Sequence, residues 1–397
     1  MVKIKPFLVE EYMNRVENTP GVLNVAETCS ASISIEELTQ LCKDPKAPGP
    51  LDLSRKLTYG DILGSDKLRS HIANLLSRDS PTPLPAENVI VTQGAIAGNY
   101  LVFYSLVGPG DHVICVYPTY QQLYSVAESL GAEVSLWKLK EECGYVPDVS
   151  ELDNLVKSNT KLIVINNPNN PTGATVPKSV LGQIVEFAKE RGITILADEV
   201  YSPLFHSLPD GQPAPPSVLS FGHEKTISTG SMSKAFALAG IRLGWVASRD
   251  KSILAAVASA RDYTSISVSM LDDQVAAYAL SPAVLPSLLD RNMSLARTNL
   301  KLFEEFVNKY SSALSWFKPN AGTTALVQFR KRGTPVDDEE FCLDLLEKTK
   351  VMFLPAGSCF GHGKDFKGYV RIGYACHTNV LEEALVKLGE YVEQNLL

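Results

Sequence analysis

The sequence lacks the features that hold small secreted or metal-stabilised proteins together. Its seven cysteines are scattered and odd in number, and no two of them form a CxxC pair. This spacing predicts neither a disulfide framework nor a zinc site, and we expect no bound metal. Unpaired thiols are typical of proteins that work in a reducing compartment.

Long hydrophobic runs are also missing. No stretch of 18 apolar residues occurs, so we expect no segment that spans a membrane. Residues 1–20 carry acidic side chains where a secretory signal would need an apolar run. The cytoplasm is therefore the expected location.

Neither basic nor acidic residues are in large excess. The chain has 37 Lys and Arg against 44 Asp and Glu, which gives a formal net charge of −7. A mildly acidic chain is not expected to bind nucleic acid or anionic membranes, because both attract basic surfaces. The net charge does not determine the charge of a single cleft. A small-molecule partner that binds in such a cleft is therefore compatible with this composition.

The sequence does contain enough apolar material for a large core, since 45% of its 397 residues are hydrophobic. Short β-rich runs alternate with helical patterns through the middle of the chain. We expect strands at 88–92, 112–116, 161–165, 193–197, 225–229 and 243–248, and helices at 95–107, 120–130 and 178–191. This alternation predicts an α/β fold on a mainly parallel sheet covered by helices on both faces.

The pattern changes near Ser281. A long helical stretch over 284–310 precedes short strands and closing helices, which predicts a smaller α+β domain. The length by itself suggests two or three domains. We therefore expect a large domain over 46–283, a small C-terminal domain over 284–397, and an N-terminal segment, 1–45, that joins the small domain.

Polar or glycine-bearing turns follow four of the expected strands. Ligands of parallel sheets bind beyond the carboxyl ends of the strands. The turns are 93–98 (QGAIAG), 166–173 (NNPNNPTG), 198–201 (DEVY) and 230–234 (GSMSK). We expect them to meet at one edge of the sheet and to form a binding site there.

The segment GSMSKAFALAGIRLGW, residues 230–245, carries the most specific chemistry. Lys234 follows Ser231 and Ser233 and precedes Arg242, so an amine lies close to three side chains that bind phosphate. The surrounding residues are apolar. We expect this setting to lower the pKa of Lys234, because an imine-forming amine must lose its proton.

Two other turns supply groups that could act on an aromatic ring cofactor. Asp198 follows a buried strand directly, and its carboxylate could pair with a protonated pyridine nitrogen. Tyr201 lies three residues on, and its phenol could donate a hydrogen bond to a ring oxygen. The side chain of Asn170 is a second candidate donor to that oxygen.

The turn at 93–98 and a nearby aromatic residue complete the set. A helix begins after this turn, so the free N–H groups of Gly94, Ala95 and Ile96 could hold a phosphate. Tyr120, from YPTYQQLY, could stack on a flat ring.

Together these motifs resemble the fold-type-I pyridoxal-phosphate enzymes, specifically the class I/II aminotransferase family, from about residue 57 to residue 375. The resemblance implies a seven-stranded, mainly parallel sheet, pyridoxal 5'-phosphate as cofactor and a Schiff base on Lys234. Lys234, Asp198 and Tyr201 become the expected catalytic residues. The implied cofactor-binding residues are Tyr59, Gly94, Ala95, Ile96, Tyr120, Asn170, Asp198, Tyr201, Ser231, Ser233, Lys234 and Arg242.

Two more segments resemble the family. LTYGDILGSDKLRSHIA is similar to the segment whose tyrosine reaches the phosphate of the neighbouring subunit, which implies this role for Tyr59 and a homodimer with shared active sites. YVRIGYA is similar to the segment whose arginine binds the substrate carboxylate, which implies this role for Arg371, with help from Asn170. A planar guanidinium suits a carboxylate because two of its N–H groups can donate to the two carboxylate oxygens at once.

The resemblance also implies a reaction. An L-amino acid would replace Lys234 on the cofactor, and the freed Lys234 amine would remove the α-proton as a general base. The quinonoid carbanion would be delocalised into the ring, helped by Asp198. The amino group would pass to a keto acid in a ping-pong cycle.

The segment LNVAETCSASISIEEL, residues 23–38, departs from the family pattern, which usually has a Gly-x-Pro loop near the substrate. Glu27 and Cys29 stand there instead. Ala26 and Glu27, followed by a helix-like stretch, look more like the aminocyclopropane-carboxylate synthases, which act on S-adenosylmethionine. The same fold hosts capreomycidine synthase, a cyclase of an arginine derivative.

These likenesses leave an alternative to transamination open, because a fold does not fix a reaction. The alternative is a lyase or cyclase that eliminates a β- or γ-leaving group from a cationic amino acid, with Glu27 as a substrate-binding residue. A non-enzymatic binding module is the third hypothesis. The presence of Lys234, Asp198 and Arg371 together argues against it.

Overall fold

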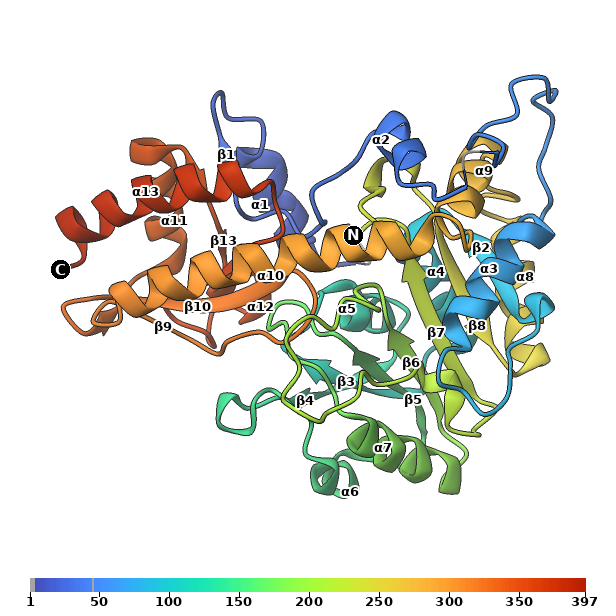
Figure 1. Cartoon of the computed structure of the whole chain (residues 1–397). Helices are drawn as coiled ribbons and strands as arrows, with labels where there is room; N and C mark the ends of the chain where they lie inside the picture. Colours follow the sequence, from blue (N-terminus) through green and yellow to red (C-terminus); the bar gives the residue numbers. More distant parts are fainter. Residues whose placement is uncertain (1–3, 45) are drawn as a thin grey trace.

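A seven-stranded sheet forms the centre of the larger part of the molecule in the computed structural model, which describes residues 4–44 and 46–397 (Figure 1). Its strand order is β2-β8-β7-β6-β5-β3-β4. The bounds are β2 Val89–Thr92, β3 His112–Tyr117, β4 Glu133–Lys138, β5 Thr160–Asn166, β6 Thr194–Asp198, β7 Thr226–Ser231 and β8 Gly244–Ser248.

Most neighbouring strands of this sheet run parallel. The exception is β8, which is antiparallel to both β2 and β7. The prediction of a mainly parallel seven-stranded sheet is confirmed. The strand β4 was not predicted. It lies at the edge of the sheet, where five of its six residues are only partly buried or exposed and Trp137 alone is buried, so its sequence EVSLWK contains no continuous apolar run.

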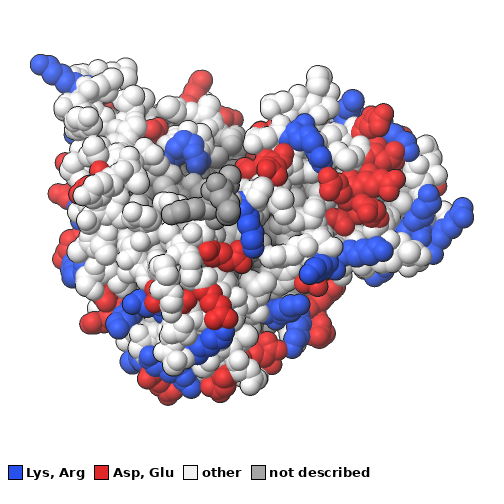
Figure 2. Space-filling model, turned by 180° about the vertical axis from the view of Figure 1, so that it is seen from behind, with Lys and Arg blue, Asp and Glu red and all other residues white. Residues whose placement is uncertain are grey.

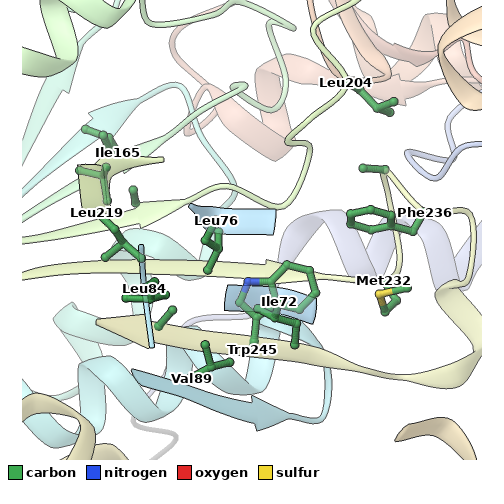
Figure 3. Close-up of a cluster of buried hydrophobic side chains, with 14 of the residues drawn as sticks. Ile72, Leu76, Leu84, Val89, Ile165, Leu204, Leu219, Met232, Phe236 and Trp245 are labelled. Carbon is green, nitrogen blue, oxygen red and sulfur yellow. The ribbon is translucent and has the colours of Figure 1, made fainter. Parts of the chain in front are cut away.

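Helices cover both faces of this sheet (Figure 1). Side chains alternate along the buried strands: Ile163 and Ile165 join one hydrophobic cluster, and Leu162 and Val164 join the other. Figure 3 shows part of the first cluster, where Ile72 and Leu76 lie near Trp245. The helices are α3 Asp66–Leu76, α4 Gly94–Leu106, α5 Gln122–Ser129, α6 Leu152–Leu155, α7 Lys178–Glu190, α8 Lys251–Asp262 and α9 Met270–Ala279.

The smaller part of the molecule is built on a five-stranded sheet with a third hydrophobic cluster. Helix α10, Leu285–Lys309, leads from the larger part into it (Figure 1). The other bounds are β9 Leu314–Trp316, β10 Thr324–Lys331, β11 Thr334–Pro335, α11 Asp338–Thr349, β12 Val351–Met352, β13 Leu354–Pro355, α12 Ala356–Phe360, β14 Tyr369–Gly373 and α13 Thr378–Asn395.

The N-terminal residues contact both parts. Helix α1, Leu8–Val16, buries Val9 and Tyr12 in the cluster of the smaller part, and β1, Leu23–Asn24, pairs in parallel with β12. Helix α2, Ile35–Gln40, instead buries Leu38 in a cluster of the larger part. The domain boundaries after residues 45 and 283 stay a prediction; residues 1–3 and 45 lie outside the described residues.

The surface carries charges of both signs. Figure 2 shows acidic and basic side chains over the rear face of the molecule, with a dense acidic group over one side of it. None of the helices in the described part of the chain is long and apolar enough to cross a membrane.

Candidate active site

A cavity of about 510 Å³ lies where β5, β6 and β7 end. Asn166, Asp198 and Ser231, the last residues of these strands, all line it. The sequence-predicted residues that the cavity brings together are Glu27, Ala95, Ile96, Tyr120, Asn170, Asp198, Tyr201, Ser231, Ser233, Lys234, Arg242 and Arg371.

Two predicted site residues do not line the cavity. Tyr59 lies on the surface and is 79% exposed. A phosphate that Tyr59 contacts would therefore have to be bound in the cavity of another copy of the chain. Gly94 lies behind Arg242: a Cβ atom there would be 3.0 Å from Arg242 Nη2, and its φ is +76°. Both features favour glycine at this position.

Lys234 is held by the N-terminal segment. Its Nζ donates to Thr28 Oγ1 at 2.6 Å and to Cys29 Sγ at 3.4 Å, and lies 3.6 Å from Glu27 Oε1. Burial lowers the pKa of Lys234, but its interactions with Cys29 and Glu27 raise the pKa by more than burial lowers it. The net pKa lies above the ordinary value, so the expected lowering is wrong, because the sequence did not reveal these neighbours.

Glu27 is the carboxylate partner of this lysine. Its Oε1 accepts the backbone N–H groups of Thr28 at 2.6 Å and Cys29 at 3.0 Å, which fixes the turn after it. Partial burial raises the pKa of Glu27, but the charge of Lys234 and these hydrogen bonds outweigh it and lower the pKa to about 2. Glu27 is therefore ionised at neutral pH.

Asp198, at the end of β6, is 3% exposed. Its Oδ2 accepts from Asn99 Nδ2 at 2.9 Å, and its Oδ1 accepts from the Val200 N–H at 3.1 Å. Burial raises the pKa of Asp198 to about 6, and these two hydrogen bonds offset that only in part. A cation placed against this carboxylate would keep it ionised.

Sequence reasoning missed Asn99. Its Oδ1 accepts from Thr229 Oγ1 at 2.7 Å, so both ends of the amide are fixed and the Nδ2 group is aimed at Asp198. The signal was available, because Asn99 is a polar residue within the apolar helix sequence GAIAGNYLVFYSL. A buried polar side chain in such a helix needs a partner.

Phosphate-binding groups gather at the start of α4. Ala95 and Ile96 lie in its first turn, where N–H groups are free, and Ser231, Ser233 and Arg242 line the same cavity. The helix approaches β8 closely, since a Cβ on Gly244 would lie 2.4 Å from the Ala95 nitrogen. This cradle, an amine and a buried carboxylate fit the phosphate, aldehyde and pyridine of pyridoxal phosphate.

Arg371 comes from β14 in the smaller part and is 3% exposed. Its Nη2 donates to the Ala26 carbonyl at 2.9 Å, and its Nη1 lies 3.5 Å from Asn170 Oδ1. Its buried Nε has no hydrogen-bond partner among the described residues. A buried guanidinium with an unused donor is suited to an incoming carboxylate.

Helix α1 forms a wall of the cavity that sequence reasoning did not foresee. Glu10 and Met13 lie on α1, and Glu17 caps its C-terminal end; their spacing of three and four residues brings them to one side, and Val9 also lines the cavity. Tyr120 donates from its hydroxyl to Glu10 Oε1 at 3.1 Å. The buried ring of Tyr201 lines the cavity as well.

Comparison with known proteins identifies the family. The model of the family "Aminotransferase class I and II" matches residues 36–388. Capreomycidine synthase of Streptomyces vinaceus is 30% identical over 87% of this chain and 84% of its own length. Aspartate aminotransferase of Pyrococcus horikoshii is 31% identical over 84% and 83%.

A solved structure agrees with these relatives. A pyridoxal-phosphate-dependent aminotransferase from Streptococcus suis is 37% identical, covers 99% of both chains and superposes with a TM-score of 0.88. The family resemblance, the expected fold and the expected cofactor are thereby confirmed. The chain belongs to the class I and II aminotransferase family of pyridoxal-phosphate-dependent enzymes.

Proposed function

We propose that this enzyme transfers the amino group of an L-amino acid to a keto acid, with Lys234 as the residue that holds the cofactor and carries the proton. One observation supports this most strongly: Lys234, the buried Asp198 carboxylate and the Arg371 guanidinium line a single cavity. When bound, pyridoxal phosphate supplies an electron sink for a carbanion at the substrate Cα.

The residues of the chain have separate tasks in this proposal. Ser231, Ser233, Arg242 and the first N–H groups of α4 bind the phosphate. Asp198, aimed by Asn99, holds the proton on the pyridine nitrogen. Tyr201 and Asn170 donate to the ring oxygen, and Tyr120 covers the ring face.

The substrate end of the cavity positions the α-carbon. Arg371 binds the α-carboxylate through its unused Nε donor, with Asn170 beside it. Lys234 then takes the proton from Cα through its Nζ as a general base, in the neutral form in which the incoming substrate amine would release it from the cofactor. Thr28 accepts from Nζ and fixes its position.

Borohydride labelling tests the assignment of Lys234. Reduction of the purified enzyme, followed by digestion and mass spectrometry, should place the cofactor on the peptide that contains Lys234. The Lys234→Ala variant should lose both the label and the absorbance of the cofactor attached as a Schiff base, whereas Lys251→Ala, a change on α8, should keep both. A label on another lysine would overturn the assignment.

A lyase or cyclase is the second candidate, favoured by the similarity to capreomycidine synthase and by Glu27 beside Lys234. Incubation with single amino acids and no keto acid separates the two. A transaminase stops after one turnover per site and accumulates pyridoxamine phosphate. Repeated turnover without a keto acid would instead support elimination or cyclisation.

We further propose that two copies of the chain form a homodimer that brings Tyr59 to the cavity of the neighbouring copy. Several large apolar side chains in its part of the sequence are exposed, including Leu53 at 88%, Leu57 at 71% and Tyr59 at 79%. Exposed apolar groups of this size favour an interface.

A cytoplasmic location fits the seven cysteines, all of which are free.

A further inference from the structure

The cavity contains more carboxylates than the proposed chemistry uses. Among the described residues that line it, the cations are Lys234, Arg242 and Arg371. The anions are Glu10, Glu17, Glu27 and Asp198. Under the proposed function the cofactor and the substrate α-carboxylate occupy all three cations, and Asp198 faces the pyridine nitrogen.

Three glutamates therefore remain without an assigned partner. Within the described part of the chain, Glu10 and Glu17 form no ion pair, and the one ion-pair partner of Glu27 is Lys234 at 3.6 Å. That partner is lost when Lys234 is engaged with the cofactor as a neutral group. Glu27 would then keep the N–H groups of Thr28 and Cys29 but have no countercharge, and a cation beside it would favour its ionised form.

The side chains of Glu10 and Glu27 are accessible to a ligand. The side chain of Glu27 is 47% exposed, and Glu10 is also exposed. Glu10 and Glu17 lie on the same wall as Met13 and Val9, so carboxylates flank an apolar strip on α1. A long side chain with methylene groups and a terminal cation matches this arrangement, because its stem packs on apolar groups while its head meets charge.

A second observation points to a carboxylate on the same ligand. The Nε of Arg371 is buried and lacks a partner among the described residues, and Arg371 also contacts the Ala26 carbonyl, directly before Glu27. The cavity thus presents a carboxylate-binding group at one end and carboxylates beside it and along α1. An α-amino acid whose side chain is an acid would meet repulsion from these glutamates.

We infer that the substrate is an α-amino acid with a cationic side chain of the amine or guanidine class. Its α-carboxylate binds Arg371, and its side-chain charge is bound by the glutamates of this wall, Glu10, Glu17 and Glu27. The inference rests on the proposed function, because it uses the assignment of Arg371 and Lys234. It names the substrate class that the cavity selects.

Binding of unreactive analogues tests this inference without turnover. Three carboxylic acids that lack the α-amino group would be titrated into the cofactor-loaded enzyme by calorimetry. They are 5-guanidinopentanoate, whose far end is cationic, hexanoate, whose far end is uncharged, and adipate, whose far end is a second carboxylate. Charge-assisted hydrogen bonds should favour the guanidino acid over hexanoate by about tenfold or more in Kd. This preference should weaken as salt is raised.

Variants locate the preference on the wall. The double variant Glu10→Gln/Glu17→Gln and the single variant Glu27→Gln should each reduce the ratio of affinities for the guanidino acid and hexanoate. Glu11→Gln is the matched control, since Glu11 lies on α1 but does not line this cavity. It removes the same charge and should leave the ratio unchanged.

The outcomes separate this inference from the proposed function. Equal affinity for the guanidino acid and hexanoate, or tighter binding of adipate, would overturn the inference. An unchanged ratio in both the double variant and Glu27→Gln would do so too. If borohydride labels Lys234 in the same preparation, such a result leaves the proposed function standing; a label elsewhere overturns the proposed function itself.

Discussion

The amide of Asn99 is the clearest case of one residue that prepares another. Asp198 is almost completely buried, and burial alone would favour its neutral form. The hydrogen bond from Asn99 favours the carboxylate, and Thr229 fixes the amide orientation by donating to the other end. Under the proposed function, a carboxylate held in this way would pair with the protonated pyridine nitrogen of the cofactor.

Removal of this amide should weaken cofactor binding. In Asn99→Ala, Asp198 loses one hydrogen bond, its pKa rises further above the ordinary value, and the affinity for pyridoxal phosphate should fall about tenfold. Equilibrium titration of the cofactor by absorbance measures this. Asn159→Ala, which removes an exposed amide far from the cavity, is the control, and an unchanged affinity in Asn99→Ala would contradict the role of Asn99.

His206 predicts a pH-dependent contribution to stability. It is 4% exposed and contacts Ser207 Oγ at 2.9 Å and the Tyr374 hydroxyl at 2.7 Å. Burial lowers its pKa to about 4, although the hydrogen bond to the Gly322 carbonyl opposes this. The unfolded chain, in which histidine has an ordinary pKa near 6.5, therefore binds a proton that the folded chain excludes between about pH 4 and 6.5.

The stability that neutral His206 contributes is present above pH 6.5 and is lost as the pH falls towards 4, by up to about 3 kcal/mol. The difference in the free energy of unfolding between wild type and His206→Gln should shrink by about 3 kcal/mol as the pH falls from about 6.5 to about 4. Urea unfolding at several pH values measures the difference. The exposed His377→Gln should give a difference that does not depend on pH in this way.

At the level of elements, strand β14 and the N-terminal segment are in unusually close contact. The Gly373 N–H donates to the Val25 carbonyl at 2.9 Å, and a Cβ on Gly373 would lie 1.6 Å from the Glu27 carbonyl oxygen. The segment that carries Glu27 therefore lies directly on the strand that carries Arg371. This contact brings a segment from the first part of the sequence and a strand from the last part together beside the cavity.

A methyl group at this contact should separate the two elements. Gly373→Ala must displace residues 25–27, which should cost about 3 kcal/mol of stability and reduce substrate affinity more than cofactor affinity. Denaturant unfolding and ligand titration measure the two effects. Gly108→Ala is the control because its Cβ would meet nothing within 4 Å. Wild-type stability in Gly373→Ala would rule out the close contact.

At the level of the whole molecule, the exposed apolar side chains predict an assembly. Leu57→Asp should weaken the proposed homodimer, because a carboxylate would be buried without a partner at the interface. Light scattering over a range of concentrations should detect monomers at concentrations where wild type is dimeric. Val386→Asp changes an exposed apolar residue on α13 and should leave the assembly intact. A monomeric wild type would refute the homodimer.

The sequence by itself determined six of the seven strands of the large sheet and much of the lining of the cavity. Strands buried on both faces must be continuously apolar, so β3, β5, β6 and β7 could be read directly, and the long helix α10 was also predicted closely. The turns that follow buried strands hold Asn170, Asp198 and Lys234. Parallel strands bring such turns to one edge, so local motifs sufficed to place them together.

Only the tertiary structure decided what surrounds these motifs. Glu27, Thr28 and Cys29 meet Lys234 from about two hundred positions away, and the electrostatic interactions with Cys29 and Glu27 reverse the expected direction of its pKa. The glutamates of α1 reach the cavity only because α1 packs on the smaller part of the molecule. Local sequence determines strands and turns, whereas pKa values and substrate selectivity depend on charges that long-range packing brings together.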